Sequence, residues 1–127
     1  MIRMRPLFGF GLDSFPLAYE LFHAPPVSAG FVWDRAHSTY LTLWAEAGVI
    51  AGSAPPLAGL VAAHMLWRGA RKPCPGRSMA TAGFAALLLC GLHALFDFSL
   101  EIQANTFLLL ALVALGLGSM QSAKGNN

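Results

Sequence analysis

The sequence predicts an all-α, polytopic membrane protein with about three transmembrane helices, preceded by a periplasmic loop region that contains a short interfacial helix. Hydrophobic residues make up 56% of the 127 residues and charged residues only 11%. An average soluble domain has roughly 25% charged residues. The mean hydropathy of +0.58 points the same way. Three long apolar stretches supply the expected spans.

The three stretches are Ala47–Trp67, Met79–Phe96 and Ala104–Met120. The first has no formal charge and would be about 30 Å long as a helix. Its paired prolines, Pro55 and Pro56, predict a bend. The other two stretches are near the lower limit of about 17 residues for a span. The expected organisation is therefore a loop region over 1–46, a three-helix transmembrane region over 47–120, and a cytoplasmic tail over 121–127.

Basic residues predict the orientation of these spans. The loop between the first two stretches contains Arg68, Arg71, Lys72 and Arg77, and short loops rich in Lys and Arg stay in the cytoplasm. The region before the first span and the 97–105 loop are then outside, together with all six acidic residues. The net charge of +2, without a basic stripe interleaved with aromatic residues, argues against a nucleic-acid partner.

The first polar constellation surrounds His37. Asp34 is a suitable N-cap, and on a helix beginning there His37, Leu41, Trp44 and Gly48 would share one face. A straight helix through Trp67 would exceed the hydrocarbon core, so residues 36–46 are expected at or above the interface. His37 could act as a general base or proton relay. The alternative is a histidine that only caps the start of a helix.

The second constellation contains His93, Asp97 and Glu101, which are spaced by four and would form one polar stripe if the helix continued. These side chains could orient a sugar or another ionisable group. They could equally be a polar cluster that holds helix ends together. A small transporter would instead place such groups at mid-membrane, whereas here they gather at one end.

Arg5 precedes a glycine-bearing turn, where a guanidinium and backbone donors could hold a phosphate. An ordinary loop is the alternative interpretation. The sequence has no zinc, P-loop, dinucleotide or serine-hydrolase pattern, so neither a metal nor another cofactor is expected.

Three of these strings resemble motifs of the O-antigen ligase/polymerase superfamily. Residues 5–11, RPLFGFG, resemble the RPLxGxG entry to that family's large periplasmic loop. The string from His37 to Gly48 resembles its His-[Asn/Ser/Gln]-x9-Gly element with an internal YLxxxxExG. Residues 93–105 resemble the HSLxDFxLxxPAN segment. The motifs follow one another in the family's order and span roughly residues 3–118.

The resemblance implies a glycosyltransferase of the bacterial inner membrane with its active face in the periplasm. Such enzymes transfer a polyprenyl-diphosphate-linked glycan to an acceptor hydroxyl, on another glycan in polymerases or on lipid A core in ligases. It implies that His37 assists the acceptor hydroxyl and that arginines, here Arg5 and Arg35, stabilise the diphosphate leaving group. His93, Asp97 and Glu101 would contact the glycan.

The resemblance also implies that further helices precede this region. We therefore expect this chain to be a C-terminal part that is inactive alone, with the missing helices supplied by another chain. The alternative is a non-catalytic membrane remnant or a helix-interaction module.

Overall fold

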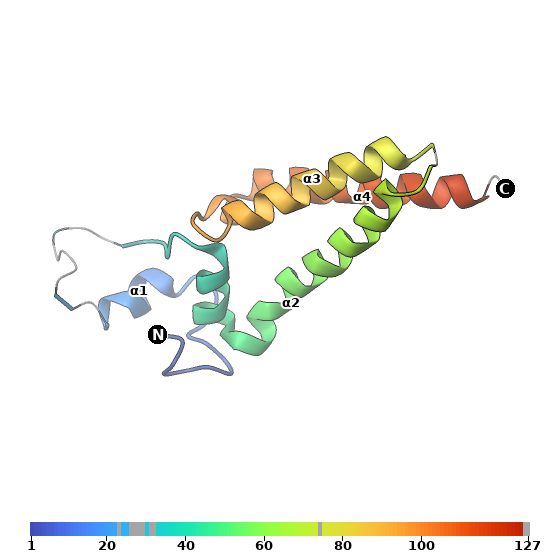
Figure 1. Ribbon diagram of the computed structural model, residues 1–127. Coiled ribbons are helices and arrows are strands. Elements are labelled where there is room, and N and C mark those ends of the chain that lie inside the picture. The colour runs from blue at the N-terminus through green and yellow to red at the C-terminus, as the bar shows by residue number, and fades with distance from the viewer. Residues whose placement is uncertain (23, 26–29, 31–32, 74, 126–127) are drawn as a thin grey trace. The chain divides into compact units, whose positions relative to one another are not determined.

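The computed structural model describes residues 1–22, 24–25, 30, 33–73 and 75–125 (Figure 1). Its elements are α1 (Phe15–Glu20), α2 (Thr39–Ala70), α3 (Arg77–His93), the 3-10 turn η1 (Ser99–Glu101) and α4 (Gln103–Gly125). No strand occurs among the described residues. This confirms the predicted all-α class.

The chain divides into two compact units. Unit 1 contains Met1–Pro56 together with Ala94–Phe98, and unit 2 contains Leu57–His93 together with Ser99–Asn127. Five of the six acidic residues belong to unit 1, and five of the eight basic residues belong to unit 2. The short segment Ala94–Phe98 therefore belongs with the N-terminal part of the chain, although it follows α3 in the sequence.

Helix α2 is interrupted at Gly48, which has non-helical backbone angles (φ 79°, ψ 165°). The break lies close to residue 46, where the sequence placed the end of the loop region. Pro55 and Pro56 lie inside the continuing helix, so the backbone does not leave helical geometry at the prolines, where the bend was expected. The part of α2 after Gly48 is about 33 Å long at 1.5 Å per residue.

Two helices are long and apolar enough to cross a membrane. They are α2, with 32 residues, and the Gln103–Gln121 part of α4. Only 11% and 6% of their most apolar windows are buried, whereas a core helix of a soluble protein would be largely covered. Large apolar side chains such as Leu60, Leu108 and Leu110 are exposed instead. This exposure is typical of helices that face lipid.

Helix α3 has 17 residues, about 25 Å at the same rise, and ends before Phe96, where the predicted second span ends. In unit 2, α3 and α4 lie side by side (Figure 1). Leu66 of α2 is fully buried, and both Gly83 and Gly116 lie against its side chain. Small residues thus permit close helix packing, as is common between membrane helices. Helix α4 continues through Gly125, into the predicted tail.

Two helix boundaries differ from the sequence-based expectation. Helix α2 begins at Thr39, so Asp34 does not cap it, and His37 lies before the helix with φ +49°. His37 therefore does not share a helical face with Leu41, Trp44 and Gly48. The Thr42 amide donates to the Ser38 carbonyl (3.0 Å), which places the first helical hydrogen bond after His37.

The expected polar stripe of His93, Asp97 and Glu101 is also wrong, because α3 ends at His93 and Glu101 lies in η1. In a continued helix the Ala94 carbonyl would accept from the Phe98 amide. It accepts from the Thr39 amide instead (3.1 Å). A partner distant in sequence thus replaces the helical hydrogen bond.

Candidate functional site

The loop formed by residues 5–11 lies against the break in α2. The Phe10 amide donates to the Ala45 carbonyl (3.0 Å), and the Gly11 amide donates to the Glu46 carbonyl (2.9 Å). The last carbonyls of a helical segment have no partner within that segment. The loop therefore caps the first part of α2, and this satisfies groups that the break would otherwise leave unpaired.

The loop also binds the restart of the helix. The Val49 amide donates to the Pro6 carbonyl (2.7 Å). Gly9 (φ +63°) and Gly48 (φ +79°) both have left-handed backbone angles. A side chain on Gly48 would overlap the Leu7 carbonyl, and one on Gly9 would overlap the Glu46 carbonyl. Both positions therefore require glycine, for conformation and for space.

Glu46 joins this junction to the segment that follows the loop. Its Oε2 accepts a hydrogen bond from the Asp13 amide (2.9 Å) and its Oε1 accepts one from the Phe15 amide (3.0 Å). Phe15 is the first residue of α1, so the carboxylate caps a short helix that has no side-chain cap of its own. Glu46 lies in the string that resembles YLxxxxExG, but no role was predicted for it. The available signal was a charged residue beside the start of an apolar stretch.

Residues at the start of α2 bind the returning segment Ala94–Phe98. The Thr39 amide lies 3.1 Å from the Ala94 oxygen and 3.3 Å from the Asp97 oxygen. The Thr39 hydroxyl donates to the Asp97 oxygen (3.2 Å) and the Ser38 hydroxyl to the Ala94 oxygen (3.4 Å). Ser38 and Thr39 are buried. Polar side chains buried this deeply are expected to be hydrogen-bonded, and these hold the two segments together.

His37 and Arg35 meet at one aromatic ring. The His37 ring contacts the Phe98 ring edge-on, with centroids 5.6 Å apart and an interplanar angle of 68°. The Arg35 guanidinium carbon lies 5.3 Å from the centroid of the same ring. Both polar side chains are exposed. Phe98, for which no role was predicted, thus contacts both an imidazole and a cation.

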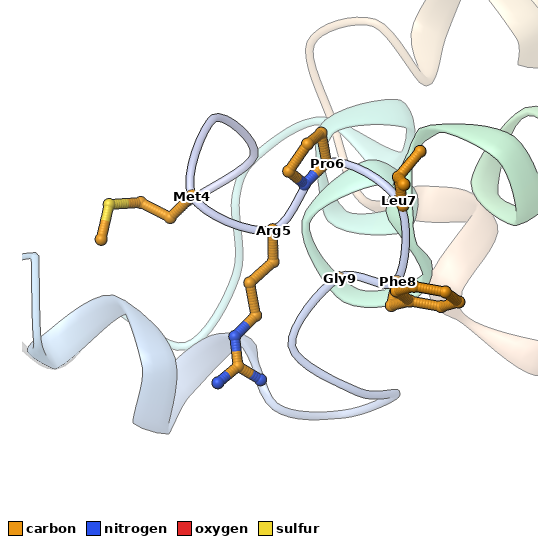
Figure 2. Close-up of a pocket in the computed structure, with 6 residues that line it drawn as sticks. All are labelled: Met4, Arg5, Pro6, Leu7, Phe8 and Gly9. Atoms are coloured by element: carbon orange, nitrogen blue, oxygen red, sulfur yellow. The ribbon is translucent and has the colours of Figure 1, made fainter.

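Arg5 is held at a different ring. Its guanidinium carbon lies 5.1 Å from the centroid of Phe10. Residues Met4 to Gly9 line an open hollow of about 400 Å³. Figure 2 shows the Arg5 and Leu7 side chains extending in opposite directions from this loop. The guanidinium is exposed, so an anion could reach it from solvent.

The other predicted site residues are Asp97, in unit 1, and His93 and Glu101, in unit 2. Asp97 contributes its backbone carbonyl, as described above. His93 belongs to unit 2, where its Nδ1 lies 3.0 Å from the Ser99 hydroxyl. The Asn105 side-chain Nδ2 donates to the Ser99 carbonyl (3.0 Å), and Glu101 is half-buried in the same turn. These contacts close the turn between α3 and α4, and they favour a structural role for this cluster.

The candidate site therefore consists of His37, Arg35 and Phe98, with Arg5 on the 5–11 loop of the same unit. An exposed imidazole can accept a proton, and an exposed guanidinium can bind an anionic oxygen. A histidine with a positive φ is uncommon, and such backbone strain is concentrated at functional sites. Among residues 1–22, 24–25, 30, 33–73 and 75–125, no group of three or more His, Cys, Asp or Glu side chains is placed to hold a metal ion.

No family model, curated protein or solved structure matches the chain. The assignment of a function therefore depends on the residues and their arrangement.

Proposed function

We propose that this chain is the C-terminal part of a membrane glycosyltransferase that resembles the O-antigen ligases and polymerases. In this proposal the enzyme transfers a polyprenyl-diphosphate-linked glycan to an acceptor hydroxyl at the periplasmic face. The acceptor is another glycan or lipid A core. The bacterial inner membrane, three spans and the periplasmic position of residues 1–46 are parts of the same proposal.

One observation supports this proposal above the others. The three strings that resemble the family's motifs lie far apart in sequence, yet segments of all three belong to unit 1. The loop of residues 5–11 binds the backbone on both sides of Gly48, and Ser38 and Thr39 bind the Ala94–Phe98 segment. A set of motifs that jointly form a site would be expected to meet in this way. The hydrogen bonds also provide a structural reason for the motif glycines.

In the proposed mechanism His37 removes the proton from the acceptor hydroxyl as that oxygen attacks the sugar carbon attached to the diphosphate. The bond from that carbon to the diphosphate oxygen breaks, and the polyprenyl diphosphate leaves with the electron pair. Arg35 and Arg5 stabilise the negative charge that develops on the leaving group. Positioned general bases contribute typically 10²–10⁴-fold to such reactions.

The alternative function, a non-catalytic helix-interaction module, is favoured by the turn between α3 and α4. There the His93, Ser99 and Asn105 contacts all close the chain on itself. This alternative explains the third motif without any substrate. It does not explain why two exposed side chains, His37 and Arg35, both contact the Phe98 ring.

The test compares His37→Ala with His64→Ala in the intact protein in its native host. His64 is an exposed histidine of unit 2 beside Trp67, and so it is a matched control. The proposal predicts that His37→Ala shortens or abolishes the surface glycan and that lipid-linked donor accumulates, while His64→Ala does neither. A normal glycan distribution in the His37 variant, at normal protein level in the membrane, would exclude the catalytic role and favour the helix-interaction module.

A further inference from the structure

The connection between α2 and α3 concentrates positive charge on one exposed surface. Four exposed basic side chains lie in the last turn of α2, in the connection and at the first residue of α3: Arg68, Arg71, Lys72 and Arg77. No acidic residue occurs from Ala47 to Phe96. These charges therefore have no acidic neighbour in the sequence that could neutralise them.

The folded unit does not neutralise this charge either. Unit 2 contains one acidic residue, Glu101. Glu101 lies in η1 with Ser99, whose hydroxyl contacts His93 at the opposite end of α3 from Arg77. The 17-residue helix separates the two ends by about 25 Å. That distance is well beyond the Debye length of about 10 Å at 0.1 M salt, so the acidic group is screened from the basic surface.

Close contacts place the last turn of α2 and the residue before α3 against α4. A side chain on Gly69 would overlap Met120, and one on Gly76 would overlap the Ser119 backbone. The Ser119 hydroxyl also lies 3.3 Å from the Gly76 carbonyl oxygen. The basic side chains therefore lie between or next to two positions that pack against α4.

Apolar side chains lie directly beside the basic ones. Trp67 is 40% exposed, and the Arg71 guanidinium carbon lies 4.3 Å from the centroid of its ring. Val61 and Met65 are exposed on the preceding turns of α2. A ligand that covers this surface must offer negative charge at one end and apolar groups next to it. Tryptophan and arginine at the end of an apolar helix are typical of the membrane–water interface.

We propose that this basic surface, made of Arg68, Arg71, Lys72, Arg77 and Trp67, binds the phosphate-bearing headgroups of anionic phospholipids. The headgroup phosphate contacts the basic side chains, and the acyl chains cover Val61 and Met65. A phospholipid satisfies both halves of the surface, whereas a free phosphate or a nucleic acid satisfies only the basic half. This inference depends on the apolar helices and not on glycan transfer.

The test uses the full chain reconstituted in vesicles, with brominated lipid as the probe. Bromine quenches nearby tryptophan fluorescence, and Trp67→Phe defines the part of the signal that comes from Trp67. At equal mole fraction, brominated phosphatidylglycerol is expected to quench this part at least about twofold more than brominated phosphatidylcholine. A ratio near one between the quenching by phosphatidylglycerol and the quenching by phosphatidylcholine would overturn the proposal.

The combined variant Arg68→Gln, Arg71→Gln, Lys72→Gln and Arg77→Gln is expected to bring the ratio to about one. Arg3→Gln, which removes an exposed charge of unit 1, is expected to leave it unchanged. An unchanged ratio in the combined variant would contradict the proposal.

Two measurements on the unsubstituted chain make the test independent of how the variants fold. Raising the chloride concentration should lower the ratio, because added salt screens exposed charges; a ratio insensitive to salt would count against headgroup binding. Inorganic phosphate at the same ionic strength should have no larger effect than chloride. A larger effect would identify a free-phosphate site and overturn the assignment to lipid.

Discussion

Gly48 and Leu7 approach so closely that a side chain on Gly48 would overlap the Leu7 carbonyl. This contact joins the 5–11 loop to the break in α2. The break leaves the Ala45 and Glu46 carbonyls and the Val49 amide without helical partners, and the loop provides partners for all three. The loop and the break therefore depend on each other, and each stabilises the other.

Gly48→Ala is expected to destabilise the protein by at least about 2 kcal/mol, because a positive φ strains an L side chain and because the added methyl group meets the Leu7 carbonyl. Unfolding by heat in detergent micelles, followed by far-UV circular dichroism, measures the effect. Gly59→Ala in the same helix is the matched control, since nothing lies within 4 Å of the added atom. That control should change stability by no more than about 1 kcal/mol. Equal unfolding temperatures for the two variants would contradict the described contact.

Glu46→Gln is expected to loosen the segment that leads into α1. The amide can accept from only one of the two backbone donors, Asp13 or Phe15, and it presents its NH₂ group to the other. Losing a hydrogen bond to a charged acceptor costs about 1.5–3 kcal/mol. Amide hydrogen exchange at Asp13 and Phe15 should therefore accelerate by about tenfold or more. Glu20→Gln, at an exposed position of α1, should leave both rates unchanged; equal acceleration in the two variants would argue against the cap.

Phe98→Leu is expected to lower turnover of the lipid-linked donor by about three- to tenfold, because the ring that contacts Arg35 and His37 is lost. Phe98→Tyr keeps the ring and should keep most of the activity. A double-mutant cycle with Arg35→Gln distinguishes two roles for Phe98, positioning of the Arg35 guanidinium and packing alone. If Phe98 acts through Arg35, the two substitutions together should cost less than the sum of their separate effects. Purely additive effects would leave Phe98 with a packing role alone.

The basic connection between α2 and α3 predicts the orientation of the chain. A reporter fused after Lys72 should be active in the cytoplasm, because four basic residues in and beside this short connection resist translocation. A second reporter fused after Glu101 should be active in the periplasm. A periplasmic result for the first fusion would reverse the proposed topology, and it would place His37 away from a periplasmic donor.

The helices could be predicted from the sequence because a long apolar stretch can be recognised from its own residues, without knowledge of distant contacts. The break at Gly48 could not, since Gly48 leaves helical geometry where the distant 5–11 loop supplies replacement hydrogen bonds. The paired prolines are a local sequence signal for a bend, and the bend was predicted at their position. Proline alone does not determine where a helix ends, and α2 continues through Pro55 and Pro56.

The site was only partly predictable for the same reason. His37, Arg35 and Arg5 were selected by type and motif, and the structure places all three in unit 1. The helical spacing assumed for His37 was wrong, because the hydrogen bonds of Thr39 to the 94–97 segment delay the start of α2. Phe98 lies at the aromatic position of the string that resembles HSLxDFxLxxPAN, but no role was predicted for it, because an aromatic residue in an apolar chain is ordinary. Its role appears only when the returning segment is placed beside residues 35–39.

The most direct test of the account is donor turnover by the intact enzyme reconstituted in vesicles. Release of polyprenyl diphosphate from a labelled donor is measured for the unsubstituted protein, His37→Ala and His64→Ala. We expect His37→Ala to lower the release rate by about 100-fold or more, with donor binding retained and with His64→Ala close to the unsubstituted rate. An undiminished rate in the His37 variant would contradict the role assigned to the group of His37, Arg35 and Phe98.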